Sequence, residues 1–159
     1  MKLLAFALIL IIQDTPETKE SIRLRKGIVG GIVAPEVTLS IDIVATKDEA
    51  SVRLMKVVNG KEVVTTGTMT RKEYDALLKE IDAVWKLPIE DPIASEDIYA
   101  LDTGVAVESG ARKWGNSAPG GCGQGKSKTQ ATRDQKAAFE RIVERIKREA
   151  DAKATKAAK

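Results

Sequence analysis

The chain has 159 residues, of which 43% are hydrophobic and 31% are charged, and its formal net charge is +3. This length and these proportions of hydrophobic and charged residues are typical of one globular domain with its own core. The sequence contains no histidine, which excludes Ser-His-Asp catalysis, Cys-His catalysis and histidine-containing zinc sites within this chain. Its single cysteine, Cys122, forms neither an internal disulfide nor a cysteine cluster for zinc or iron-sulfur. The small charge and the 4% of aromatic residues argue against nucleic acid as a partner, and no cofactor is indicated.

Residues 1–20 have the pattern of a signal peptide followed by a linker. Lys2 precedes an uncharged apolar run over residues 3–12, and polar residues begin at Gln13. Such a run is too short to span a bilayer as a helix and matches the apolar part of an export signal. Because no pair of small residues marks a cleavage site, a buried first strand or an uncleaved anchor is the alternative. We expect export, and therefore a periplasmic or secreted protein.

Four strands are expected between residues 21 and 68. Residues 21–25 alternate apolar and polar side chains, and a glycine-rich apolar loop over residues 27–35 follows. Residues 37–43 alternate in the way that is typical of a half-buried antiparallel strand. A third strand includes Val52. It is joined to the fourth by Asn59-Gly60, a two-residue hairpin signal because both positions tolerate positive φ.

An amphipathic helix is expected after the fourth strand. Thr70 and Glu73 form a capping box, in which each side chain binds a backbone N–H at the helix start. An apolar stripe at helical spacing follows, and Leu87-Pro88 ends the helix. The members of the stripe are Tyr74, Leu77, Leu78, Ile81 and Trp85.

A hairpin and a second helix complete the expected elements. Residues 105–108 and 112–114 carry opposite charges on either side of a Ser-Gly turn, so we expect them to pair. A second capping box is formed by Thr132 and Gln135, and apolar residues recur at helical spacing over residues 139–146.

The predicted fold class is α+β, with an antiparallel sheet of about six strands and two amphipathic helices packed on one face. The element order is ββββ-α-ββ-α. Residues 21–150 form the single domain, and residues 151–159 are expected to fray, because their alanines and lysines have nothing to bury.

The stretch from Gly120 to Ser127 reads Gly-Gly-Cys-Gly-Gln-Gly-Lys-Ser and matches the phosphate-binding P-loop pattern. A P-loop connects a buried strand of a parallel sheet to a helix, whereas the residues before Gly120 are not apolar and only one helix follows. We therefore interpret the match as coincidental. Basic and hydroxyl side chains nevertheless surround the expected start of the last helix, so a nucleotide- or phosphate-binding protein is the alternative function. The candidate anion-binding residues are Lys126, Ser127, Lys128 and Arg133.

Asp102-Thr103-Gly104 matches the core of the aspartic protease motif, in which two such loops share a proton. A single copy without the rest of that fold is interpreted as a turn, and we predict no catalytic residue and no metal site.

Two segments are candidate contacts for a protein partner, the apolar loop over residues 27–35 and the basic segment over residues 112–133. The alternative for the loop is that it packs beneath the edge of the sheet. The candidate contact residues are Ile28, Val29, Ile32, Val33 and Trp114.

Four short segments follow one another in a recognisable order. They are a glycine-rich strand and loop (25–32), a leucine-containing helix (74–78), a Trp-Lys-Leu-Pro stop (85–88) and an Asp-Ile-Tyr segment (97–101). This order resembles emfourin-type small bacterial domains. Members of that family inhibit thermolysin-like metalloproteases, so the resemblance implies a non-enzymatic, inhibitor-like binding module. It covers residues 21–99 and assigns no inhibitory residue.

The sequence thus predicts an exported, non-catalytic domain that binds another protein. Contact with a membrane is expected only through residues 1–20, if they are retained, and the oligomeric state is left open.

Overall fold

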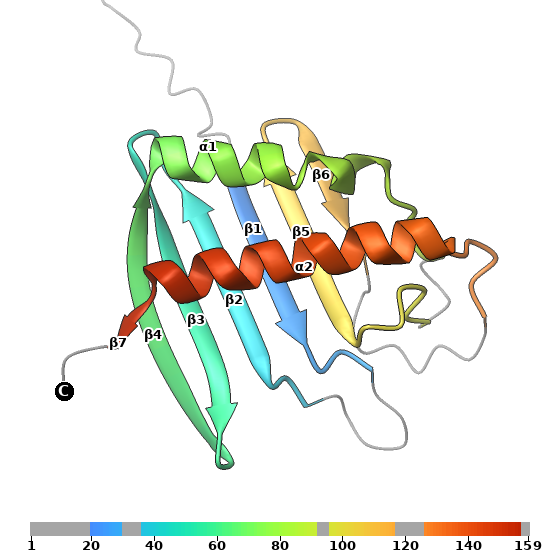
Figure 1. The fold of residues 1–159 in the computed structure, drawn as a ribbon, viewed down its shortest axis with the longest axis horizontal. Helices are drawn as coiled ribbons and strands as arrows, with labels where there is room; N and C mark the ends of the chain where they lie inside the picture. Colours follow the sequence, from blue (N-terminus) through green and yellow to red (C-terminus); the bar gives the residue numbers. More distant parts are fainter. Residues whose placement is uncertain (1–19, 30–35, 92–95, 117–125, 157–159) are drawn as a thin grey trace, which may run out of the picture.

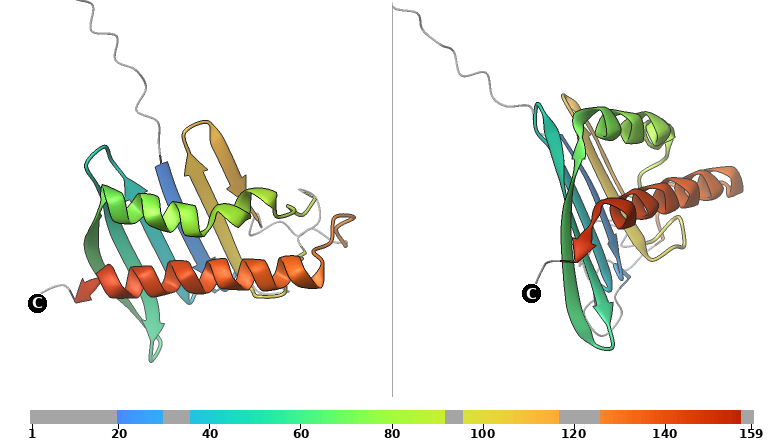
Figure 2. Two further views of the ribbon diagram at one scale, coloured as in Figure 1. Left: turned by 45° about the horizontal axis from the view of Figure 1, so that its top comes forward. Right: turned by 60° about the vertical axis from the view of Figure 1, so that its left-hand side comes forward.

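The computed structural model describes residues 20–29, 36–91, 96–116 and 126–156 (Figure 1). These residues form one antiparallel sheet with the strand order β6-β5-β1-β2-β3-β4-β7. Both long helices lie on the same side of it, as the two views of Figure 2 show. The predicted α+β class, the order of the six longer strands and the placement of the helices are confirmed.

The element bounds are as follows. The strands are β1 (Glu20–Lys26), β2 (Leu39–Ala45), β3 (Glu49–Val58), β4 (Lys61–Thr70), β5 (Thr103–Ser109), β6 (Arg112–Gly115) and the short β7 (Thr155–Lys156). The helices are α1 (Arg71–Glu80), the 3-10 helix η1 (Asp82–Lys86) and α2 (Arg133–Lys153).

The core lies between the sheet and the helices. Alternation along the strands places apolar side chains such as Ile22 and Ile43 on the helix side, where they are fully buried. The apolar stripes of both helices meet them, and Phe139 of α2 stacks on Tyr99 with a ring separation of 4.1 Å. Three buried rings, including Trp114 at 6.2 Å from Phe139, fill the end of the core near β5 and β6.

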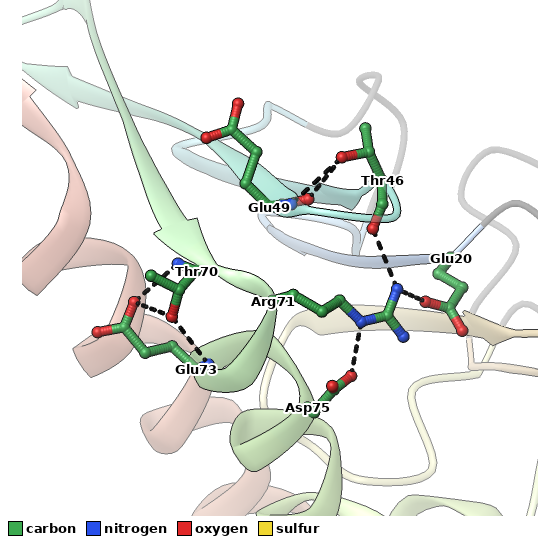
Figure 3. A network of polar contacts seen from close by, with 7 residues as sticks. All are labelled: Glu20, Thr46, Glu49, Thr70, Arg71, Glu73 and Asp75. Carbon is green, nitrogen blue, oxygen red and sulfur yellow. Dashed lines mark hydrogen bonds and ion pairs between the residues drawn. The ribbon is translucent and has the colours of Figure 1, made fainter.

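The predicted capping box at the start of α1 is present. The Thr70 N–H donates to the Glu73 carboxylate at 2.8 Å, and the Glu73 N–H donates to the Thr70 hydroxyl at 3.3 Å (Figure 3). The next residue, Arg71, joins α1 to the sheet, because its guanidinium contacts Glu20 of β1 at 2.6 Å and Asp75 at 2.9 Å. The helix begins at the predicted residue and is fixed there by long-range contacts.

The end of α1 differs from the prediction. The α-helix stops at Glu80, because Ile81 has a φ of −93° and a ψ of 10°, and a 3-10 turn takes over. Trp85 therefore lies on η1 and is only half-buried. The chain still leaves the helical segment at Leu87, as the Leu-Pro pair indicated.

The C-terminal segment also differs from the prediction. We expected fraying from residue 151, but α2 continues to Lys153 and β7 pairs with Thr65 and Thr66 of β4. Asp151 pairs with Lys56 at 2.5 Å, and Lys153 pairs with Glu73 at 2.6 Å. These contacts join residues 80 or more positions apart in the chain, so local sequence does not indicate them.

The ion pair between Glu73 and Lys153 gives a testable pH dependence. Lys153, together with the Thr70 N–H and hydroxyl, lowers the pKa of Glu73 from 4.5 to about 2. A carboxylate with a depressed pKa stabilises the fold above its unfolded pKa, and this contribution is lost as the pH falls towards 2. Glu73→Gln keeps the shape of the capping box but removes the charge, so we expect a lower melting temperature at neutral pH.

The difference in melting temperature between wild type and Glu73→Gln should shrink as the pH falls from 4.5 to about 2. Thermal melts followed by circular dichroism across this range measure it. Glu144→Gln is the control, because Glu144 is exposed and pairs with Lys147 of the same helix. A difference that stays constant over the whole range would contradict the ion-pair interpretation.

Candidate functional surface

Of the predicted anion-binding residues, Lys126, Ser127 and Lys128 lie in the connection that leads to α2, and Arg133 is the first residue of that helix. Ser127 is buried, its N–H donates to the Glu96 carboxylate at 2.5 Å, and its hydroxyl accepts the Asp91 N–H at 3.0 Å. The Lys128 N–H donates to the Asp91 carboxylate at 2.6 Å and lowers the pKa of that carboxyl. The N–H groups of Ser127 and Lys128 are therefore already bound to carboxylates of this chain.

Two backbone N–H groups at the start of α2 are bound within a capping box. Ser127 lies five residues before the N-cap Thr132, whose own capping box with Gln135 binds N–H groups of α2. Lys126, Lys128 and Arg133 are exposed. The strand before this segment, β6, is antiparallel to β5. Residues 117–125, which include Cys122 and the glycines of the P-loop pattern, lie outside the described residues.

Asp102 has a structural role at a turn. Its carboxylate accepts the N–H of Ile28 at 2.8 Å and of Val29 at 2.6 Å, and its own N–H donates to Asp97 at 2.6 Å. Its φ of 50° is in the left-handed region, which aspartate tolerates in turns. The turn interpretation of the Asp-Thr-Gly triplet thus agrees with the geometry, since this carboxylate already holds two backbone groups.

The predicted partner-contact residues are not together on the surface. Ile28 and Trp114 are buried, and the Trp114 Nε1–H donates to the Leu87 carbonyl at 3.0 Å. Val29 is 58% exposed. Ile32 and Val33 lie outside the described residues. Among the described candidates, Val29 alone is available to a partner.

A different apolar surface is formed by the end of the β3–β4 hairpin. Val58, Val63 and Val64 are 49%, 42% and 37% exposed, and together we call them the hairpin patch. The remaining exposed large hydrophobic residues of the described ranges, Val29 and Ile89, lie on other segments. The patch is therefore a local concentration of exposed apolar side chains.

The position of α2 explains why Val58 and Val63 are uncovered. The helix crosses β3 where Asp151 pairs with Lys56, and Figure 1 shows the hairpin continuing beyond the helix. Val63 pairs with Lys56 in the register, so Val63 and Val58 lie on the helix side of the sheet but past its cover. Val64 lies on the opposite face, next to Met55.

Sequence reasoning missed the hairpin patch, although a signal was present. Val57-Val58 and Val63-Val64 are adjacent apolar pairs, so each pair places one side chain on each face of the sheet. A sheet with helices on one face cannot bury both members of such a pair in the same core. The valines predicted the strands correctly, but the alternation of apolar and polar residues does not continue to the hairpin end, where apolar side chains lie on both faces of the sheet.

The middle of the sheet face opposite the helices carries a row of charged side chains. Arg23, Asp42 and Arg53 lie on neighbouring strands in register, and each guanidinium is 4.0 Å from the Asp42 carboxylate. Because these charges compensate one another across the central strands, this row provides no apolar contact comparable to the hairpin patch.

A groove of about 310 Å³ lies beside α1 and η1, facing the β5–β6 turn. Asp75 and Asp82 line it together with Trp85, whose ring is covered by the Arg112 guanidinium at 4.2 Å. Acidic and basic side chains both line this groove, and the Arg112 guanidinium already covers the Trp85 ring. The groove therefore indicates no particular ligand.

No protein-family model, curated protein or solved structure matches this chain. Within the described ranges, no group of three or more cysteine, aspartate or glutamate residues is placed to hold a metal ion. None of the helices in the described part of the chain is long and apolar enough to cross a membrane.

Proposed function

We propose that this chain is a non-catalytic binding module that contacts another protein through the hairpin patch. The observation that carries the proposal is the exposure of Val58, Val63 and Val64 on a hairpin that extends past its covering helix. Fully burying an exposed valine side chain is worth about 1.5–3 kcal/mol, and contact with a partner would gain the part of this free energy that the remaining exposed area represents.

The hairpin patch also has the chemistry of a protein contact. Lys61 lies beside Val58 and Val63 on the helix side of the sheet, and Glu62 lies beside Val64 on the opposite face, so the apolar side chains on each face have a charged neighbour. The geometry of Ser127 and Asp102 favours neither phosphate binding nor proteolysis, because their polar groups are engaged within the chain. A binding role is the function that the surface supports best.

The proposal is tested by site-specific cross-linking. A photoreactive benzoylphenylalanine replaces Val58, and the same group replaces Arg141 on the exposed side of α2 as the control position. In a native extract we expect a discrete protein adduct from position 58 and none from position 141. Val63→Lys should reduce the adduct by at least about tenfold, a cost of about 1.4 kcal/mol, because it places a charge in the apolar contact.

Val29→Lys is the matched control, because Val29 is exposed to a similar degree and lies on another segment. It should leave the adduct at position 58 unchanged. Adducts of equal yield from positions 58 and 141, or an adduct insensitive to Val63→Lys, would reject the hairpin patch as the contact.

The resemblance to emfourin-type domains supports one class of partner, a thermolysin-like metalloprotease. Peptide hydrolysis by such a protease, measured with and without this chain, decides that class. Slower hydrolysis that Val63→Lys restores would assign inhibition to the hairpin patch. Unchanged hydrolysis would assign the partner to another class of protein.

Residues 1–20 support the proposal that the module acts after export. The mass of the native N-terminus, determined in separated cell fractions, tests this step. Retention of Met1 in a cytosolic fraction would refute export and leave the contact surface unaffected.

A further inference from the structure

We infer that the helix-side face of the β3–β4 hairpin end binds an acidic amphipathic helix of the partner, which lies beside α2. This inference rests on the proposed function and states the chemistry of the partner segment. The residues that carry it are two lysines and two valines, which we call the helix-side square: Lys56 and Val58 of β3, and Lys61 and Val63 of β4.

The register of the hairpin places the four side chains of the square on one face of the sheet. Val63 lies opposite Lys56, and Lys61 lies opposite Val58. Residues opposite each other in an antiparallel pair share a face, and so do residues two apart along a strand. Leu54, two residues before Lys56, is buried in the core, so this face is the helix side. Each valine therefore has one lysine across the ladder and another along its own strand.

The square is basic, and one of its two positive charges is uncompensated. The Lys56 ammonium contacts the Asp151 carboxylate at 2.5 Å. Lys61 is exposed, and within the described ranges no ion pair joins it to a carboxylate. Glu62 lies on the opposite face, where it pairs with Val57. An acidic partner therefore meets complementary charge on this face, whereas a basic partner meets repulsion.

The uncovered strip of the helix side has the width of one helix. Val58 and Val63 are 49% and 42% exposed, and Figure 1 shows the hairpin end beside α2. The stretch from Lys56 to the turn residue Gly60 spans about 13 Å at the rise of a strand. A helix with its side chains has a diameter of about 10–12 Å, so one helix fits between α2 and the turn.

Helices are the elements that this face of the sheet already binds. Both α1 and α2 place an apolar stripe against the strands, and the ion pair of Asp151 with Lys56 joins the flank of α2 to β3. A partner helix beside α2 repeats this arrangement. Its apolar stripe covers the two valines, and its carboxylates lie next to the lysines of the square.

Asp151 limits the contact, because its carboxylate already neutralises Lys56. Asp151→Asn keeps the shape of the side chain and releases the Lys56 ammonium for a carboxylate of the partner. We expect this variant to bind an acidic helix about threefold more tightly, and the loss of an exposed surface ion pair leaves the fold intact.

The test uses the full chain with labelled valine methyl groups and a synthetic peptide. The peptide has two repeats of Leu-Glu-Ala-Leu-Leu-Gln-Glu between an acetyl and an amide group, which in a helix places leucines on one stripe and glutamates on both flanks. A titration followed by NMR at about 20 mM salt leaves surface charges weakly screened. We expect the methyl resonances of Val58 and Val63 to shift and the bound peptide to be helical.

The same peptide with lysine in place of glutamate is the control and should bind at least about tenfold more weakly. Lys61→Glu should weaken binding of the acidic peptide at least about tenfold, and Lys61→Met, which keeps the apolar stem, about threefold. Lys72→Glu makes the same change of charge at an exposed residue of α1, which begins at the end of β4 remote from the turn. It should leave binding unchanged.

Failure of this inference differs from failure of the proposed function. Equal binding of the two peptides, unchanged binding in Lys61→Glu or an extended bound peptide would overturn the acidic helix. Shifts confined to Val57 and Val64 would overturn its location on the helix side.

The proposed function survives such a result if the adduct at position 58 is still lost in Val63→Lys, which removes apolar contact whatever the charge of the partner. Shifts of Val58 and Val63 that depend on protein concentration without peptide would also overturn the inference, because the occupant would be a second copy of this chain.

Discussion

Gly27→Ala is expected to destabilise the fold by about 3 kcal/mol, a large fraction of the stability of a domain this size. Gly27 follows β1 and has a φ of 87°, a conformation that side-chain-bearing residues rarely adopt. A Cβ built there would lie 1.9 Å from the Glu36 carbonyl oxygen, so the backbone of the neighbouring segment has to move. Urea unfolding followed by tryptophan fluorescence measures the loss.

The cost arises because several contacts converge on this turn. The Gly27 N–H donates to the Asp102 carbonyl at 2.9 Å, and the next two N–H groups bind the Asp102 carboxylate. Any shift that relieves the clash with Glu36 also weakens these bonds.

Gly110→Ala is the matched control for Gly27→Ala. Gly110 also has a positive φ, 59°, but a Cβ there meets no atom within 4 Å. Only backbone strain remains, and we expect a loss of about 1 kcal/mol. Equal losses at the two positions would show that the contact with Glu36 is relieved without cost.

Features that depend on neighbouring residues were predictable from the sequence. The capping boxes of Thr70 and Thr132 require a residue pair three positions apart, and both are present as expected. The Asn59-Gly60 turn is equally local, and both residues have the positive φ that the prediction required. With alternation along the strands, these signals were sufficient for the α+β class and its element order.

Features that depend on residues distant in the chain were not predictable. Ser127 belongs to a pattern typical of phosphate loops. Only the fold shows that the Glu96 carboxylate accepts the Ser127 N–H and that the Asp91 carboxylate accepts the Lys128 N–H. Trp114, expected at a partner contact, is instead buried against Phe139. In both cases the direction of the polar or aromatic groups is set by contacts with residues that are distant in the chain.

The hairpin patch shows a third limit. Valines predict strands because β-branched side chains suit the pleated surface, but strand propensity does not report the length of a covering helix. Whether Val63 is buried depends on where α2 crosses β3, which Lys56 and Asp151 fix. The candidate functional surface therefore followed from the packing of elements that the sequence had predicted separately.

Phe139→Ala is expected to destabilise the fold by about 3–5 kcal/mol, the range for truncating a buried phenylalanine. Phe139 is fully buried, stacks on Tyr99 and contacts the ring of Trp114, so its removal leaves a cavity between α2 and the β5–β6 end of the sheet. Phe139→Leu fills most of that volume and should cost less than about 1.5 kcal/mol. Glu140→Ala, on the exposed side of the same turn, should change stability by no more than about 0.5 kcal/mol.

Urea unfolding of the three α2 variants, followed by near-ultraviolet circular dichroism, separates packing from helix propensity. A loss in Phe139→Ala no larger than in Phe139→Leu would mean that the ring stack does not hold α2 on the sheet. In the folded fraction of Phe139→Ala, the partner adduct at position 58 should persist, because the ring stack lies at the β5–β6 end of the sheet and the β3–β4 hairpin lies near the opposite edge. Binding at the hairpin end and packing around Phe139 are therefore expected to respond to different substitutions.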